Sequence, residues 1–565
     1  MAIEGLHPAL VFLIGAVLVA ATRGKARQGI SLATPLIAAL ALLGLPDGSS
    51  FSFELMGQTL IFAHIDRLSF LFSLLFLVAA IIGVIYSLHH RSRLELTSAL
   101  LYAGSAISAV LAGDLITLFI AWEMLAVTSA FIVWARGDRE SISSGLRYFG
   151  FQIASGFCLL IGVLLHQQAG GSLIIEDLGV LDLASPGALW ILIAFGIKAG
   201  FPLLHTWIVD TYPRATATGT VFLCVFTTKT AVYALARFFP GTEELITIGA
   251  VMTFFPIFYA VIENDLRKVL SYSMINQIGF MVVGIGLGTE LAINGAVAHA
   301  CNDVLFKGLL FMSMGAVLHV TGKSCGTDLG GLWKKMPRTT VLCLVGAASI
   351  SAVPLFCGFV SKSMVMAAAI EEGHQWLWLV LLFASAGVLE HAGIKIPFFA
   401  FFAHDRGLKA SDPPGNMLLA MAISALLCIF IGCRPDLLYS LLPYSVEFQP
   451  FTTTHVLTQV QLLMFASLAV MVLMKSGIYP PELVRVNLDF DVFTRLAGRW
   501  GLLRLRGRLT RWSESLSDLV LDRIPALVVE SSALSERISP RWLLVLPSLL
   551  LVLLLLIFLI ANLYS

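Results

Sequence analysis

Residues 190–237 read WILIAFGIKAGFPLLHTWIVDTYPRATATGTVFLCVFTTKTAVYALAR, two apolar runs that each carry one lysine near the middle. These lysines are Lys198 and Lys229, and Pro202 and His205 follow the first of them. A lysine at the centre of a membrane span costs about 2.5–3.5 kcal/mol on translocon-based scales, so lysines inside spans are functional candidates by default. The stretch therefore predicts a pair of membrane helices that carry functional cations.

The composition of the whole chain indicates a membrane protein. Of the 565 residues, 58% are hydrophobic and 13% are charged, which excludes a soluble globular protein of this length. The net charge of +1 gives no reason to expect a nucleic acid as partner. The eight cysteines contain no C-x-x-C pair, and no G-x-G-x-x-G motif opens a βαβ unit. We therefore expect neither a metal site nor a bound cofactor.

Apolar runs long enough to cross a membrane recur along the chain. They predict an all-α polytopic membrane protein with about 14–16 transmembrane helices. The run at 339–370 contains Pro354, Gly358, Ser361 and Lys362, which predicts a broken span. The predicted spans are 8–22, 29–45, 66–88, 96–112, 114–134, 147–168, 187–206, 215–239, 244–262, 269–288, 292–320, 339–370, 375–403, 416–434, 455–474 and 541–562.

Charged residues in the loops fall into two sets that alternate along the chain. Lys and Arg collect in one set, and Asp and Glu collect in the other. The positive-inside rule places the basic set in the cytoplasm and the acidic set outside. Basic loops lie near 23–27, 91–93, 136–139, 214, 267–268, 334–338, 406–409 and after 475, and acidic loops lie near 47–54, 176–182, 243–244, 290, 371–372 and 436.

Carboxylates inside the spans are candidate partners for the lysines. Glu123 lies in mid-span beside Trp122, whereas Asp114 begins the same run and fits a helix-end carboxylate better. Burial and a nearby carboxylate act on a lysine in opposite directions, so a Glu–Lys pair can hold or release a proton near neutral pH. We therefore expect Glu123, Lys198 and Lys229 to form a proton relay.

A later span carries three more ionisable residues at spacings of four. His299, Asp303 and Lys307 would lie on one helix face. This face predicts a continuation of the proton path. A metal site is disfavoured, because one histidine and one carboxylate leave the coordination sphere short.

Two lysines extend the series further along the chain. Lys362 lies in GFVSKSMV, and Lys395 lies in LEHAGIKIPFFAFF, beside Glu390 and His391. The second cluster lies either in mid-membrane or near a helix end, and we favour a functional interpretation.

Proline positions predict interrupted helices in both halves of the chain. Pro202 follows Lys198, and Pro397 follows Lys395, so freed backbone groups at each site could face a hydrated cavity. Interruptions at corresponding places indicate inverted repeats around a central ion site. We expect N-terminal helices at 1–95, a first repeat at 96–239, a second at 244–403, additional helices at 416–474, a cytoplasmic amphipathic segment at 485–540 and an anchor helix at 541–565.

The amphipathic character of residues 485–540 rests on their pattern. Leu, Trp and Val recur among Arg at helical spacing, which predicts one or two helices on the cytoplasmic face. A lipid surface and a protein surface, either its own or a partner subunit's, are equally good candidates for the contact.

Six motifs between about residues 60 and 435 occur together. They are W-E-x-L at 122–125, K-x-x-x-P-L-x-x-x-W at 198–207 with D-x-Y-P at 210–213, K-x-x-V-Y-A-L at 229–235, N-D-L-R-K-V-L-S-Y-S at 264–273, L-F-K-x-L-L-F at 305–311 and G-F-x-S-K at 358–362. In combination they resemble the antiporter-like subunit family. Mrp-type multisubunit sodium/proton antiporters share this family with the proton-pumping membrane arm of respiratory complex I.

The resemblance implies roles for individual residues. Glu123 and Lys198 would be the family's paired carboxylate and lysine, and Lys229 the connecting lysine. A central polar axis would include His299 and Lys307, and Lys395 would be the exit-side lysine. Asp303 departs from many relatives, which have histidine or alanine there. The remaining ionisable candidates would be auxiliary: His205, Asp210, Asp303, Lys362, Glu390 and His391.

The resemblance also implies a function and a setting. The segments HAGIKIPFFAFF and PPELVRVNLDFD are most similar to antiporter D-type subunits, which implies a proton-translocating subunit of a multisubunit Na+/proton antiporter. Its partners would be other membrane subunits in a bacterial inner membrane, and it would have no catalytic centre or cofactor of its own. The alternative is a proton-pumping subunit of an NADH:quinone oxidoreductase or a membrane-bound hydrogenase. A vestigial structural role is disfavoured, because the charged residues are retained.

Overall fold

The computed structural model describes residues 6–55, 58–175 and 181–480, together with residues 483, 487, 489, 490 and 492. The chain divides into two compact units, a first of Met1–Asn487 and a second of Leu488–Ser565. The predicted anchor at 541–565 lies outside the described residues. The predicted amphipathic segment at 485–540 lies outside them as well, apart from Asn487, Asp489, Phe490 and Val492.

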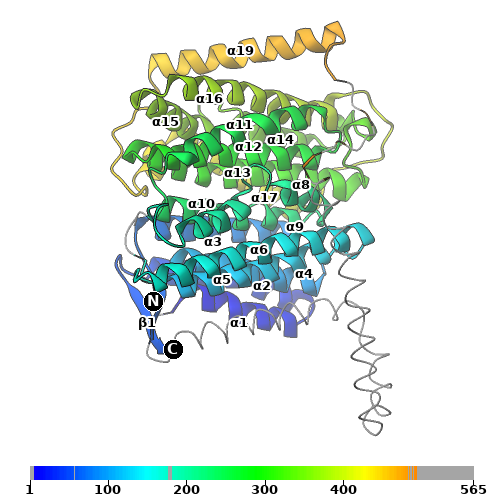
Figure 1. Cartoon of the computed structure of the whole chain (residues 1–565). Coiled ribbons are helices and arrows are strands. Elements are labelled where there is room, and N and C mark those ends of the chain that lie inside the picture. Colours follow the sequence, from blue (N-terminus) through cyan, green and yellow to red (C-terminus); the bar gives the residue numbers. More distant parts are fainter. Residues whose placement is uncertain are drawn as a thin grey trace, which may run out of the picture. The chain divides into compact units, whose positions relative to one another are not determined.

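The first unit is a bundle of helices (Figure 1). Its N-terminal part is built from long apolar helices that lie against their sequence neighbours, because short loops join antiparallel helices. These helices are α1 (Pro8–Ala21), α2 (Gly24–Leu43), α3 (Arg67–Ser87), α4 (Arg93–Leu111), α5 (Leu115–Trp134) and α6 (Arg139–Gln168). Asp114 caps α5 by accepting hydrogen bonds from the backbone of residues 116 and 117, which confirms its helix-end role.

The middle of the chain contains shorter helical pieces. They are α7 (Ala188–Ala199), α8 (Thr206–Thr211), the 3-10 turn η1 (Tyr212–Arg214), α9 (Gly219–Leu223) and α10 (Phe226–Phe238). The predicted interruption at Pro202 is confirmed, because α7 ends at Ala199 and the chain resumes a helix only at Thr206. Leu203 within the break has a positive φ of 72°.

The C-terminal part of the unit repeats this pattern of long and broken helices. Its elements are α11 (Glu244–Ile262), α12 (Leu266–Leu287), α13 (Glu290–Thr321), η2 (Gly326–Asp328), η3 (Leu332–Lys334), α14 (Pro337–Ile350), α15 (Cys357–Glu371), α16 (Gln375–Val388), η4 (Leu389–Lys395), η5 (Phe398–Phe402), α17 (Gly415–Cys433), α18 (Pro435–Tyr439) and α19 (Thr453–Ser476). The predicted break within 339–370 is confirmed, because residues 351–356 separate α14 from α15. At Pro397 the chain does not break but widens into the π-helical turns η4 and η5.

The membrane spans agree with the sequence prediction. Twelve described helices are long and apolar enough to cross a membrane, and three shorter apolar helices, α1, α7 and α14, account for the remaining predicted runs up to residue 474. The windows of Gly219–Phe238 and Leu266–Leu287 are entirely buried, whereas only 6% of the α19 window is buried. The centre of the bundle therefore lies at α10 and α12, and α19 lies at its edge against α16 and η4 (Figure 1).

Within the described residues, a small β-hairpin adds two strands to the predicted all-helical fold. The strands β1 (Ser50–Leu55) and β2 (Gln58–His64) pair antiparallel, with an irregular register between Phe51 and Ser52. The hairpin connects α2 to α3 at the end of the bundle that carries the acidic loops. His7 and Asp114 bond to its backbone, which ties the hairpin to α1 and α5.

Candidate functional site

The first lysine of the central stretch lies at the end of a broken helix. Lys198 occupies the last turn of α7, and its side chain is 0% exposed. Its ammonium group donates a hydrogen bond to the carbonyl of Trp122 on α5 at 2.7 Å and lies 4.5 Å from the indole ring centroid. A helix C-terminus and an aromatic face both attract a cation, so this position stabilises an ammonium group.

Glu123 follows the carbonyl that Lys198 contacts. Its carboxylate is buried, and Oε1 has no hydrogen-bond partner in the described part of the chain. Gly156 on α6 leaves space for this group, because a Cβ at that position would lie 1.5 Å from Oε1. One turn earlier, Gln152 is also buried without a partner for either amide atom among the described residues. Buried polar atoms of this kind bind ordered water, so the pocket around Glu123 is suited to hydration.

The second lysine of the central stretch forms a buried ion pair with a residue of α13. The ammonium group of Lys229 lies 2.5 Å from Oδ2 of Asp303, and both side chains are 0% exposed. Lys229 also donates to the carbonyl of Cys224, which precedes α10, at 3.3 Å. A buried ion pair balances two charges that would each be costly alone. Asp303 is therefore the direct partner of Lys229, a pairing that the sequence did not indicate.

The other two residues of the predicted ionisable face of α13 contact neighbouring helices. Lys307 donates to the hydroxyl of Ser273 on α12 at 2.8 Å. His299 lies 3.1 Å from Oε1 of Gln277 on α12 and 3.0 Å from the hydroxyl of Ser361 on α15. Because the amide oxygen can only accept, Nε2 of His299 donates to Gln277, and Nδ1 accepts from Ser361. The predicted common face of α13 is thus a buried row of polar contacts.

Lys362 lies directly after the serine that contacts the histidine. Its side chain is 2% exposed, and its ammonium group donates to the carbonyl of Ile350 at 2.8 Å. Ile350 is the last residue of α14, so the break between α14 and α15 provides this acceptor. The ammonium group also lies 5.1 Å from the ring centroid of Phe280 on α12. Lys362 therefore belongs to the same buried row as His299.

Lys395 has a different environment. Its ammonium group donates to the carbonyls of Ala260, Val261 and Glu263 at 3.2, 2.6 and 2.7 Å. These carbonyls lie at the C-terminal end of α11, where backbone acceptors lack helical partners. Lys395 therefore acts as a cap for α11.

The two residues expected to assist Lys395 lie one turn earlier in η4. Glu390 accepts a hydrogen bond from the hydroxyl of Tyr479 at 2.5 Å. The side chain of His391 is fully buried. His391 lies within electrostatic range of Lys307, Lys362 and Lys395, which places it between the row of α13 and Lys395.

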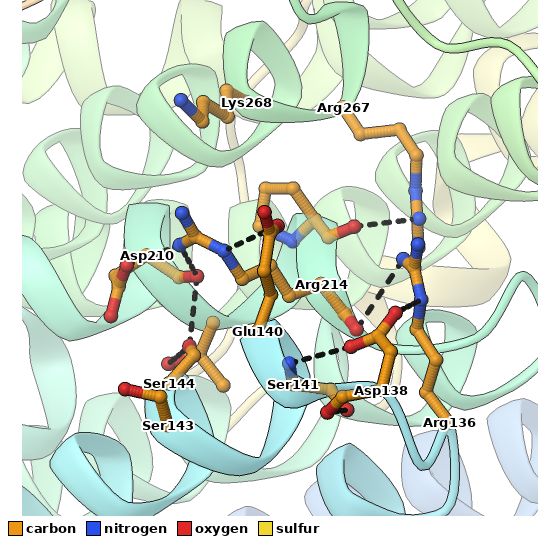
Figure 2. A network of polar contacts seen from close by, with 12 residues as sticks. Arg136, Asp138, Glu140, Ser141, Ser143, Ser144, Asp210, Arg214, Arg267 and Lys268 are labelled. Atoms are coloured by element: carbon orange, nitrogen blue, oxygen red, sulfur yellow. Dashed lines mark hydrogen bonds and ion pairs between the residues drawn. The ribbon is translucent and has the colours of Figure 1, made fainter. Parts of the chain in front are cut away.

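His205 and Asp210 follow the break after α7. The imidazole of His205 is buried and packs against the ring of Phe255, with ring centroids 4.7 Å apart. Asp210 forms ion pairs with Arg147 at 2.6 Å and with Arg214. Figure 2 shows Arg214 between Asp210 and Glu140 in a polar network at the end of the bundle that carries the basic loops. Asp210 is thus part of a structural network at this end.

Arg267 joins the two halves of the bundle at the same end. It is 1% exposed and donates to the carbonyls of Pro213 at 2.7 Å and Ala215 at 3.2 Å. It also contacts the hydroxyl of Thr220. A buried guanidinium group that binds several carbonyls fixes the backbone between α8 and α9 against the start of α12.

A second polar cluster lies near this network. The buried carboxylate of Glu95 accepts hydrogen bonds from Thr216 at 3.0 Å and from Thr218, and it lies 3.1 Å from Nε2 of His90. The contact with Glu95 raises the pKa of His90, which lies in the loop before α4. Among the described residues, no group of three or more His, Cys, Asp or Glu residues is placed to hold a metal ion.

Comparison with known proteins decides the family of this chain. The family described as "NADH:quinone oxidoreductase/Mrp antiporter, TM" matches residues 112–388. The D-type subunit of the Na(+)/H(+) antiporter of Alkalihalophilus pseudofirmus is 30% identical over 355 residues, which cover 59% of this chain and 71% of that protein. The chain belongs to this family. The residues that match the family model end before Lys395 and include the buried ionisable residues Glu123, Lys198, Lys229, His299, Asp303, Lys307 and Lys362.

The chain is also similar to a hydrogenase component and to a chain of an Mrp complex. Hydrogenase-4 component B of Escherichia coli is 26% identical over 427 residues, and the chain spans a little under two thirds of that protein, 63%. In the structure of the Mrp complex from Dietzia sp. DQ12-45-1b, one chain matches with a TM-score of 0.77 and 23% identity. The match covers 94% of this chain and 62% of the Mrp chain, and it shows a common fold.

Several residues of the site carry no signal that sequence reasoning could use. Gly156, Gln152 and Gln277 are neither charged nor part of a recognised motif, yet they line the buried carboxylate or bond to His299. The sequence marks Ser361 only as a polar residue within a broken span, although its hydroxyl bonds to His299 and it directly precedes Lys362. The partners of Lys198 and Lys362 are backbone carbonyls, which no residue pattern reveals.

Proposed function

We propose that this chain is the proton-translocating membrane subunit of a multisubunit monovalent cation/proton antiporter, and that its series of buried ionisable residues carries the protons. The observation behind this proposal is the buried ion pair of Lys229 and Asp303, with further buried ionisable groups on either side of it. Such groups are costly inside a membrane and mark proton or ion pathways. The buried series comprises Glu123, Lys198, Lys229, Asp303, Lys307, His299 and Lys362.

The chemistry of the series suits stepwise proton transfer. Lys198, Lys307 and Lys362 donate to uncharged oxygens, so each can give up a proton without leaving a bound carboxylate unpaired. Lys229 differs from these three lysines, because it forms a full ion pair with the carboxylate of Asp303. His299 donates through one nitrogen and accepts through the other, which lets it pass a proton between α12 and α15.

Relatives support the function and its setting. Subunits named as parts of Na(+)/H(+) antiporters match over most of their length, which supports Na+ as the cation and other membrane subunits as partners. A bacterial inner membrane is the setting that these relatives suggest. Residues 96–239 and 244–403 remain our proposed repeats.

The test is substitution of the first pair in an assembled complex. We expect Lys198→Ala and Glu123→Ala each to reduce cation-driven proton movement to background. Each substitution removes one of the two buried ionisable groups at the start of the series. The measurement is collapse of a pH gradient on addition of Na+ to inside-out vesicles. Co-purification of the partner subunits shows whether the complex still assembles.

Lys323→Ala is the matched control, because Lys323 is an exposed lysine in a loop at the basic end, with 52% of its side chain exposed. This variant should transport like the wild type. Normal Na+-dependent transport in either Lys198→Ala or Glu123→Ala would show that the relay assignment is wrong.

A redox-linked complex is the second candidate. It is favoured by the relative named hydrogenase-4 component B, which matches 67% of this chain. The described residues would serve that function equally well, since electron transfer would take place in other subunits. Purification of the intact complex and identification of its subunits separates the two, because only a redox complex would contain subunits with electron-transfer cofactors.

A further inference from the structure

A pocket opens at the end of the bundle that carries the basic loops. Its volume is about 630 Å³, within the range of about 300–1,000 Å³ that small-molecule sites occupy. One wall comes from residues 326–334, which connect α13 to α14, and the other comes from residues 398–406. The candidate membrane span Gln375–Phe402 ends within the second wall. The pocket therefore lies at the level where a span leaves the membrane.

Close packing and an ion pair hold the two walls together. A Cβ at Gly330 would lie 2.3 Å from the carbonyl oxygen of His404, and a Cβ at Gly331 would lie 2.5 Å from Cβ of Asp405. Both glycines also have positive φ, 132° and 69°, which side chains disfavour. Lys335 donates to both carboxylate oxygens of Asp405, at 2.9 and 3.0 Å. The pocket is therefore a defined feature of the packing between these segments.

The polar lining of the pocket has an excess of positive charge. Lys334 and Arg406 line it from opposite walls, and both are exposed. Among the described lining residues the acidic side chain is Asp405, whose carboxylate is already paired with Lys335. The charges of Lys334 and Arg406 are therefore available to an anionic ligand.

Aromatic side chains form the apolar part of the lining. Trp333 lies on one wall, and Phe398, Phe399 and Phe402 lie on the other. Trp333 and Phe402 are 47% and 46% exposed. The ammonium group of Lys334 lies 5.1 Å from the indole ring centroid of Trp333. Tryptophan gathers at membrane–water interfaces, and lysine extends from there toward the headgroups. The pocket thus places cations directly beside exposed aromatic rings at the end of a span.

This combination matches the chemistry of an anionic phospholipid. Its phosphate needs cationic donors, which a guanidinium and an ammonium group supply, and its glycerol and acyl portions need apolar surface. Basic pockets on the cytoplasmic side of membrane proteins bind such headgroups. The positive-inside rule places this pocket on that side. A soluble phosphate would use the cations but would leave the exposed aromatic rings without a role.

We propose that this pocket binds the headgroup of an anionic phospholipid in the cytoplasmic leaflet. Lys334 and Arg406 hold the phosphate, and Trp333 and Phe402 pack against the glycerol and the start of the acyl chains. The inference goes beyond the proposed function, because none of the lining residues belongs to the buried ionisable series. It would hold for a redox-linked complex as well as for an antiporter.

Photocross-linking tests the site directly. The full complex is reconstituted in phosphatidylcholine vesicles that contain a photoactivatable phosphatidylglycerol, and the cross-linked positions are identified by mass spectrometry. We expect cross-links within residues 326–334 and 398–406. Lys334→Ala combined with Arg406→Ala should lower them about tenfold or more, since each cation near the membrane surface contributes to the binding of anionic lipid. Undiminished cross-linking in this double variant would overturn the proposal.

Arg338→Ala combined with Lys409→Ala is the matched control. It removes two exposed cations at the same end of the bundle that do not line the pocket. This double variant should cross-link like the wild type. An equal loss in both double variants would show that the lipid responds to the overall surface charge and that the pocket is no specific site. Co-purification of the partner subunits checks that each variant assembles.

Two further measurements identify the ligand. Trp333→Ala should lower cross-linking severalfold, and inorganic phosphate should not displace the lipid. A normal yield in Trp333→Ala together with full displacement by phosphate would indicate a site for soluble phosphate and would overturn the lipid assignment. Equal cross-linking by a photoactivatable phosphatidylcholine would do the same for the preference for anionic lipid. No transport is measured, so normal transport in Lys198→Ala would refute the proposed function without changing this result.

Discussion

The two interrupted helices contain the same turn but use their lysines differently. In each break a proline precedes a leucine with positive φ, 72° at Leu203 after Pro202 and 75° at Leu355 after Pro354. Lys198 lies before its break and binds a carbonyl of another helix, whereas Lys362 lies after its break and binds the carbonyl that its own break releases.

The two lysines are therefore held in place by different parts of the structure. The place of Lys198 depends on the packing of α5, α6 and α7, where Trp122 donates to Ser155 and Ser155 donates to the carbonyl of Ala194. The place of Lys362 depends on a local break and on α19, whose Gln459 binds within that break. The first lysine is enclosed by the bundle, and the second lies close to its surface.

The largest expected effect comes from removing Lys362, and Lys395 is the lysine to compare with it. Lys362→Ala should reduce Na+-driven proton movement to background, because Lys362 adjoins the contact between Ser361 and His299. Lys395→Ala should retain most transport but lower the thermal stability of the complex. The substitution removes the donor to three carbonyls of α11, and each buried carbonyl left without a donor costs about 1–3 kcal/mol. Transport assays and thermal unfolding of the purified complex measure the two effects. Background transport in Lys395→Ala with normal stability would restore Lys395 to the relay.

The enclosure of the first lysine can be tested on α6. Gly156→Ala places a methyl group where the carboxylate of Glu123 lies, so we expect a partial loss of transport with normal assembly. Gly150→Ala is the matched control on the same helix, because no atom lies within 4 Å of its added Cβ. Equal transport in the two variants would show that the position of Glu123 is not critical.

The smallest expected effect concerns the shared turn itself. Leu203→Ile and Leu355→Ile should each destabilise the protein by about 1 kcal/mol, because β-branched residues tolerate positive φ poorly. Both leucines are more than half exposed, so little packing is lost. Leu189→Ile, at an exposed position within α7, provides the control. If only one of the two variants lowers the unfolding temperature, the two breaks do not rely on the same turn.

Sequence alone determined the class of the protein and most of its architecture. Runs of apolar residues identify membrane spans because a helix must satisfy its backbone in lipid, and a run of about 20 residues is needed to cross. Proline and charged residues within such runs are rare enough to stand out, which is why the breaks near Pro202 and Pro354 and the buried lysines were predictable. The spacing of His299, Asp303 and Lys307 likewise placed them on one helix face.

Only the tertiary structure decided which of these groups act together. The sequence paired Lys198 with Glu123 and assigned the exit role to Lys395, but it could not show that Asp303 pairs with Lys229 or that Lys395 caps α11. Ion pairs between α10 and α13, and carbonyls released at helix ends, depend on how distant segments pack and on backbone groups that every residue carries. The amino-acid sequence therefore does not indicate which residues are these partners.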